Sequence, residues 1–81
     1  MASRDVLDRL WALMRENVVD ASESPVHKAF PELAKRAKRE AADFIALPPP
    51  ADEQEFTARR QSATRMIQSW LDESDQRCSG Q

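Results

Sequence analysis

The stretch Phe30–Phe44, FPELAKRAKREAADF, decides the fold because it separates apolar and charged residues onto two faces of a helix. At about 100° per residue, its apolar residues gather on one arc and its bases and acids on the opposite arc. With the residues just outside the stretch, the apolar arc consists of Val26, Phe30, Leu33, Ala34, Ala37, Ala41, Phe44 and Ile45. We therefore predict an amphipathic helix whose apolar arc carries two neighbouring helices.

Two further segments, at about 4–20 and 53–75, have the apolar periodicity of a helix. The first covers an arc of about 160°, with Val6, Leu7, Leu10, Trp11, Leu13, Met14 and Val18. The second has Phe56, Ala63, Met66, Ile67, Trp70 and Leu71. The sequence thus predicts an all-α fold, either a small three-helix bundle or a helical hairpin plus an N-terminal helix, which dimerises.

Helix-start signals precede the segments at about 4–20 and 25–46. Ser3 is placed to cap the first, and Ser24-Pro25 has an N-cap residue followed by proline at the first helical position. Pro31 cannot donate a backbone hydrogen bond to residue 27, so we expect the helix over 25–46 to break there.

The third helix follows three consecutive prolines at 48–50, which favour an extended and stiff connector. Asp52 is placed as its N-cap, and Glu55 as the capping-box partner three residues on. The polar tail 76–81 is expected to fray.

The length of 81 residues predicts one small domain over 1–81 with a modest core. Cys78 is the only cysteine and His27 the only histidine, so an internal disulfide is excluded and a structural zinc site with four ligands is nearly excluded. Small domains without such links often gain stability by association. We therefore expect a protein partner, a second copy of the chain, or both; whether Cys78 is ever oxidised is left open.

Charge and hydropathy bound the cell compartment and the partners. The chain has 12 basic and 14 acidic residues, a formal net charge of -2, so no overall positive field attracts a polyanion or a membrane. The sequence shows no apolar run of membrane-spanning length and no secretory signal, which with the lone thiol favours the cytoplasm. Most of the bases are Arg, and Ala is abundant, as in proteins of GC-rich bacterial genomes.

Five bases on the central helix form the strongest local charge signal: Lys28, Lys35, Arg36, Lys38 and Arg39. They could contact phosphates of a nucleic acid, with Arg36 reaching a base edge. However, Glu32, Glu40 and Asp43 share their arc at the spacing of helical ion pairs. We therefore favour a solvated, salt-bridged face, and keep nucleic-acid binding as the alternative. The connections DASESP and LPPPAD also fit the short turn of a helix-turn-helix poorly.

The sequence contains no convincing catalytic set. His27 lies between two prolines with no base-orienting partner at a recognised spacing, and we expect it at the surface or its boundary. No cofactor, metal or small-molecule substrate is expected, so the prediction is a protein that is not an enzyme.

Large or cationic residues on the apolar arcs are the candidates for contact with a partner: Trp11, Met14, Arg59, Met66 and Trp70. Packing in the core is the default for both tryptophans, with partial exposure as an anchor the alternative. For Arg59 the default is a stem that lies over apolar neighbours while the guanidinium reaches water near the helix end, and the alternative is an interface contact. Asn17 interrupts the first arc, and could either bond locally or fix how helices pair at an interface.

These observations favour a small helical module that binds a protein partner through apolar helix faces, as an adaptor, accessory subunit or regulator. A homodimer formed by helix packing is the simplest version. The alternative is a nucleic-acid-binding accessory protein that uses the basic face of 31–46.

Overall fold

The structure, a computed structural model, describes residues 3–79, except for the side chains of Val26, Lys28 and Ser79. This part of the chain forms the helices α1 (Arg4–Ser22), α2 (Pro25–Lys28), α3 (Pro31–Ile45) and α4 (Glu53–Ser79). None of the described residues is in a β-strand. The prediction of an all-α small bundle is confirmed.

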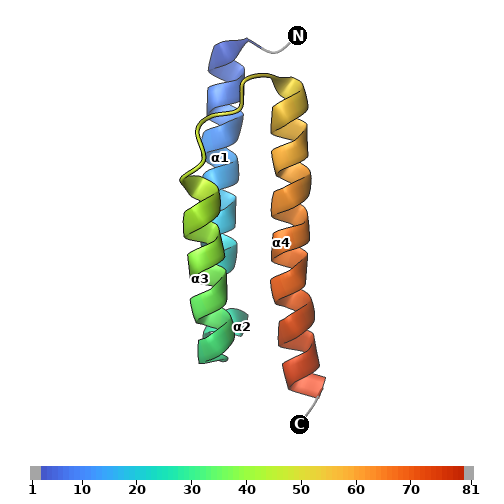
Figure 1. The fold of residues 1–81 in the computed structure, drawn as a ribbon. Coiled ribbons are helices and arrows are strands. Elements are labelled where there is room, and N and C mark those ends of the chain that lie inside the picture. Colours follow the sequence, from blue (N-terminus) through green and yellow to red (C-terminus); the bar gives the residue numbers. More distant parts are fainter. Residues whose placement is uncertain (1–2, 80–81) are drawn as a thin grey trace.

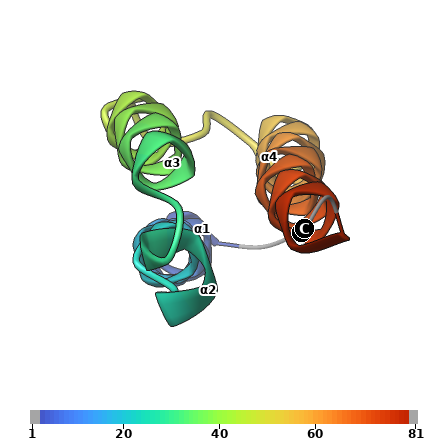
Figure 2. The same cartoon turned by 90° about the horizontal axis from the view of Figure 1, so that it is seen from below.

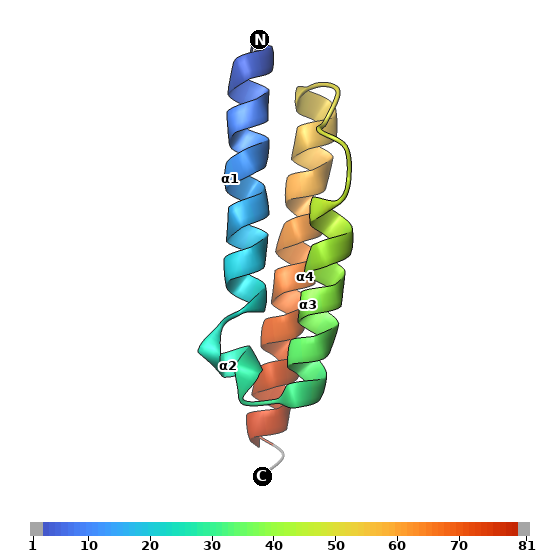
Figure 3. The same cartoon turned by 90° about the vertical axis from the view of Figure 1, so that its left-hand side faces the viewer.

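The three long helices lie side by side and form an elongated bundle of 49 × 16 × 16 Å (Figure 1). Viewed along its length, the bundle places α1, α3 and α4 at the corners of a triangle (Figure 2), and each of them contacts the other two. Helices α1 and α4 run in the same direction and α3 runs opposite to both (Figure 3). The short α2 turns the chain from α1 into α3 and also contacts α4.

Most of the predicted helix starts are present. The Ser3 Oγ accepts a hydrogen bond from the Val6 N–H at 3.3 Å, and the Asp52 Oδ1 accepts one from the Glu55 N–H at 2.8 Å. The chain also breaks before Pro31, where α3 begins. Ser24 is an exception, because its side chain makes no capping hydrogen bond to α2.

The helix ends differ modestly from the predicted ones. Helix α1 continues to Ser22 rather than residue 20, and α3 ends at Ile45. Helix α4 continues to Ser79, beyond the predicted end near residue 75, while 80–81 lie outside the described residues; that the tail frays stays a prediction. Two contacts hold this last turn, since the Arg77 guanidinium lies 6.0 Å from the Phe30 ring centroid and 3.6 Å from Glu73.

The core runs along the axis of the bundle. Its buried members are Trp11, Met14, Val18, Leu33, Ala37, Ala41, Phe44, Ala63 and Trp70. The α3 members are the small and large residues of the predicted apolar arc, and the Trp11 and Phe44 rings pack with centroids 5.4 Å apart. The expectation that α1 and α4 pack on the apolar arc of α3 therefore agrees with the structure. Burial of these side chains is the main stabilising term of a bundle with so few residues.

The proline linker between α3 and α4 is held by arginines on both sides. Arg4 of α1 donates to the Pro50 carbonyl at 2.8 Å, and Arg59 of α4 donates to the Pro48 carbonyl. Pro50 is itself buried. Since the three prolines have no backbone N–H to donate, this extended segment is held through its carbonyl groups, to which the arginines donate charge-assisted hydrogen bonds.

Candidate protein-interaction surface

Most of the residues predicted to contact a partner lie inside the bundle. Trp11, Met14 and Trp70 are buried core residues, and Met66 is partly buried against the same core. The two tryptophans are enclosed by the other helices, whereas Met14 is buried but also lines the open groove between α1 and α4. The default interpretation of the two tryptophans as core residues agrees with this placement.

Arg59 is largely covered, with 13% of its side chain exposed. Its guanidinium carbon lies 4.8 Å from the Trp11 ring centroid, and its Nη2 donates to Glu55 Oε1 at 2.7 Å. Together with its hydrogen bond to the Pro48 carbonyl, these contacts make Arg59 an internal brace between α4, α1 and the linker. The default interpretation is therefore wrong about the guanidinium, which lies over the Trp11 ring instead of reaching water. Glu55 thus pairs with Arg59 rather than completing the predicted capping box.

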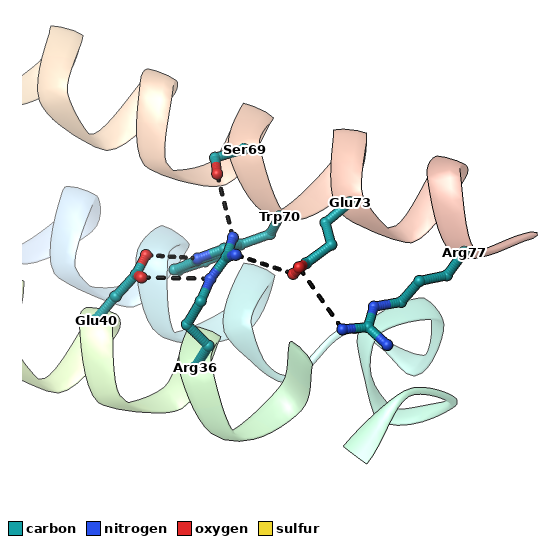
Figure 4. Close-up of polar contacts among 6 residues, drawn as sticks. All are labelled: Arg36, Glu40, Ser69, Trp70, Glu73 and Arg77. Carbon is teal, nitrogen blue, oxygen red and sulfur yellow. Dashed lines mark hydrogen bonds and ion pairs between the residues drawn. The ribbon is translucent and has the colours of Figure 1, made fainter. Parts of the chain in front are cut away.

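A polar network closes the side of the bundle between α3 and α4 (Figure 4). The Trp70 Nε1–H donates to Glu40 Oε1 at 2.9 Å, and the other oxygen of Glu40 lies 3.3 Å from Arg36 Nε. Arg36 also donates to Ser69 Oγ at 3.1 Å and pairs with Glu73 at 3.0 Å. Arg36 Nε and Glu73 Oε2 have no hydrogen-bond partner among the described residues. The contacts of Arg36 with the two glutamates are therefore ion pairs and not aligned hydrogen bonds.

Arg36, the residue that the nucleic-acid alternative places against a base edge, is part of this network. Arg36 is bound by two glutamates, while Lys35, Lys38 and Arg39 are exposed and the Lys28 side chain lies outside the described residues. The bases of α3 are therefore interleaved with acids, including acids that α4 contributes. This arrangement matches the predicted salt-bridged face, and mutual neutralisation weakens the field that phosphates would meet.

His27 is buried, which corrects the expectation that it lies at the surface or its boundary. It is 1% exposed, and its Nδ1 lies 2.8 Å from the Ala21 carbonyl oxygen. Its ring meets the Trp70 ring edge-on at a centroid distance of 5.9 Å, and its Nε2 has no hydrogen-bond partner among the described residues. The short helix α2 folds back beneath the bundle and carries the ring inward, which sequence periodicity over four residues could not reveal.

An apolar groove between α1 and α4 is the most distinctive open surface. The α1 side presents Leu10 and Leu13, which are 38% and 55% exposed, and the α4 side presents the partly buried Phe56 and Ile67. The complete lining is Leu10, Leu13, Met14, Asn17, Val18, Phe56, Arg60, Ala63, Thr64 and Ile67. Grooves of this kind bind the apolar face of an amphipathic helix.

The width of the apolar arc in the first helix is the sequence feature that corresponds to this groove. Leu10 and Leu13 were counted with the core of the first helix, whose apolar arc of about 160° is wider than the roughly 100° that one packed face needs. The structure buries the half of the arc that holds Leu7 and Trp11, and leaves the other half, with Val6, Leu10 and Leu13, partly in solvent. The apolar arc of α1 is therefore wider than the face that the bundle buries.

Among the described residues, no three or more His, Cys, Asp and Glu side chains are grouped as the ligands of a metal ion would be, and no helix combines the length and the hydropathy of a membrane span. Comparisons of the chain with protein-family models, with curated proteins and with solved structures found no match.

Proposed function

We propose that this chain is a small, non-enzymatic protein-interaction module of the cytoplasm that binds an amphipathic helix in the groove between α1 and α4. The observation that carries the proposal is the exposure of Leu10 and Leu13 directly beside Phe56 and Ile67. Isolated exposed leucines are common on proteins, whereas apolar residues gathered from two helices into one groove are typical of interaction sites. An adaptor, an accessory subunit or a regulator needs no more than such a face.

The bundle supports the groove as a rigid platform. Met14, Val18 and Ala63 form its floor and are core residues, so the position of the floor is set by the packing of all three long helices. A preformed apolar floor lowers the ordering cost of binding, because only the incoming helix must be immobilised.

Nucleic-acid binding has less support from the same surface inventory. Arg36 is held by Glu40 and Glu73, and the exposed bases of α3 lie among Glu32 and other acids. Binding of a labelled DNA or RNA oligonucleotide at low salt, with a steep loss as salt is raised, would favour that alternative over the proposal.

Site-specific photo-crosslinking in the native host tests the proposal. A photoreactive amino acid in place of Leu13 reports contacts in the groove, and the same amino acid at Gln61 is the matched control, exposed on α4 but outside the groove lining. We expect a defined protein adduct at Leu13 and not at Gln61. The adduct partner, or a second copy of the chain, is then purified and mixed with the intact protein.

Reconstitution decides the outcome. We expect binding by the purified pair, and its loss in the double variant Leu10→Gln with Leu13→Gln, which removes two apolar contacts while leaving the buried core unchanged. Equal adducts at Leu13 and Gln61, or full binding by the double variant, would contradict the proposal.

A further inference from the structure

Helix α1 carries two apolar seams, of which the bundle uses one. Leu7, Trp11, Met14 and Val18 form the buried seam. The second consists of Val6, Leu10, Leu13 and Asn17, spaced by four, three and four residues and open to solvent. Alternating spacings of three and four residues are the pattern of a coiled-coil seam, which needs a second helix to cover it.

We propose that the occupant of the groove is α1 of a second copy of this chain, packed antiparallel across a two-fold axis. This inference rests on the proposed function and names its partner. A two-fold interface uses the same surface on both copies, so it requires a seam that complements itself. The second seam of α1 meets this condition in both its apolar and its charged residues.

The apolar match is best in one antiparallel register. When Leu10 lies opposite Leu13 of the second copy, symmetry places Leu13 opposite Leu10, so the leucines form the centre of the interface. Val6 then lies opposite Asn17 at either end, where the amide remains close to water. A shift of one heptad in one direction would set Leu13 against Asn17 and Leu10 against Asp20. A shift in the other direction would leave Leu13 against Ser3. Both shifts lose the contacts between leucines.

The flanking charges match in that same register. Arg9 comes directly before Leu10, and Glu16 directly before Asn17, so both flank the seam on the same side. In an antiparallel pair, residues at these flanking positions of the two helices face each other. Arg9 of each copy therefore meets Glu16 of the other, which forms two symmetric ion pairs. Both side chains are exposed, and neither is paired with another described residue of its own chain.

A parallel pairing lacks this complementarity. It would place Arg9 against Met14 of the second copy and Glu16 against Ala21, and these two apolar residues are buried or partly buried in the bundle. It would also set Asn17 against Asn17. The charge pattern thus favours the antiparallel arrangement. The groove also includes Phe56 and Ile67 of α4, so the second copy would cover these two residues together with the seam.

Sedimentation equilibrium of the purified intact chain is the first test. We expect a reversible dimer, and Leu13→Gln should raise its dissociation constant by about tenfold or more, since each dimer loses two buried leucines. Leu47→Gln is the matched control, because Leu47 is 42% exposed but lies in the linker, away from the groove. Circular dichroism should show equal helix content in all three proteins.

A charge exchange tests the antiparallel register. Arg9→Glu and Glu16→Arg should each weaken self-association by about tenfold, because each replaces two attractive contacts with two like-charge contacts. The two variants mixed together should form a heterodimer, and the double variant should dimerise like the original chain. Arg15→Glu, the same charge change at an exposed position outside the seam, should have little effect.

Three outcomes would overturn the inference: a monomer at all concentrations, no heterodimer from the mixed variants, or equal weakening by Arg15→Glu and Arg9→Glu. A purified monomer whose Leu13 still crosslinks to a different protein would refute the second copy as occupant and leave the proposed function standing. A monomer whose Leu13 forms no specific adduct would refute both.

Discussion

The indole N–H of Trp70 donates a 2.9 Å hydrogen bond to the Glu40 carboxylate, which links the centre of the core to the charged side of α3. Trp70 is fully buried, and Glu40 lies at the boundary and pairs with Arg36. A buried indole N–H without an acceptor is costly, so Glu40 allows the largest core side chain to be buried completely. The salt-bridged face of α3 is therefore part of the fold and not only its solvated exterior.

Removing the Glu40 side chain, which accepts the hydrogen bond of Trp70, should destabilise the bundle more than removing only its negative charge. We expect Glu40→Ala to lower the free energy of unfolding by about 1–3 kcal/mol, since it leaves the Trp70 N–H without its partner. Glu40→Gln keeps a carbonyl oxygen and loses only a half-exposed ion pair with Arg36, which is worth about 0.5 kcal/mol. Urea unfolding followed by circular dichroism measures both.

Asp43→Ala is the matched control for these changes, because Asp43 is an exposed acid on the same helix. It should alter the free energy of unfolding by no more than a few tenths of a kcal/mol. Equal losses in Glu40→Ala and Glu40→Gln would show that the charge, and not the acceptor, is what matters.

Truncating either tryptophan should unfold the chain. Trp11→Ala or Trp70→Ala removes about 3–5 kcal/mol, which is comparable to the whole stability of a domain of this size. Lys35→Glu should have little effect on folding, because Lys35 is exposed. Thermal melts monitored by circular dichroism compare the three variants, and cooperative wild-type melting of both tryptophan variants would contradict their placement in the core.

Arg59 should be needed for stability, whereas its neighbour Arg60 should not. We expect Arg59→Ala to cost about 1–2 kcal/mol, from loss of the contact over Trp11 and of the hydrogen bonds to Pro48 and Glu55. Arg59→Lys keeps the charge but cannot reproduce the planar, forked contact, so it should recover only part of the loss. Arg60→Ala, at an exposed position, should unfold at the same urea concentration as the original chain; a matching loss would argue against the brace.

His27 should behave as a core residue. His27→Ala leaves a cavity beside Trp70 and should lower the free energy of unfolding by about 2–3 kcal/mol. His27→Phe should cost less, because it refills the space, and the Ala21 carbonyl keeps its hydrogen bond from the Ser24 N–H. Chemical denaturation of the two variants provides the comparison, and wild-type stability in both would place His27 back at the surface.

The local features were readable in advance where they depend on neighbouring residues. Ser3 and Asp52 cap their helices through contacts three residues away, and Pro31 ends one helical segment and starts the next through its own ring. The apolar arc of α3 was likewise visible, because helical periodicity alone determines which residues share a face.

The tertiary packing of the bundle decided which apolar residues are exposed and where His27 and Arg59 lie. It buried only half of the wide arc of α1, turned His27 inward against Trp70, and placed Arg59 over Trp11 instead of in solvent. Periodicity shows which residues share a face of a helix, but not which neighbour covers that face or how much of it. Those outcomes depend on the positions of helices far apart in the chain, so the open groove and its exposed leucines emerge only once α1, α3 and α4 are packed together.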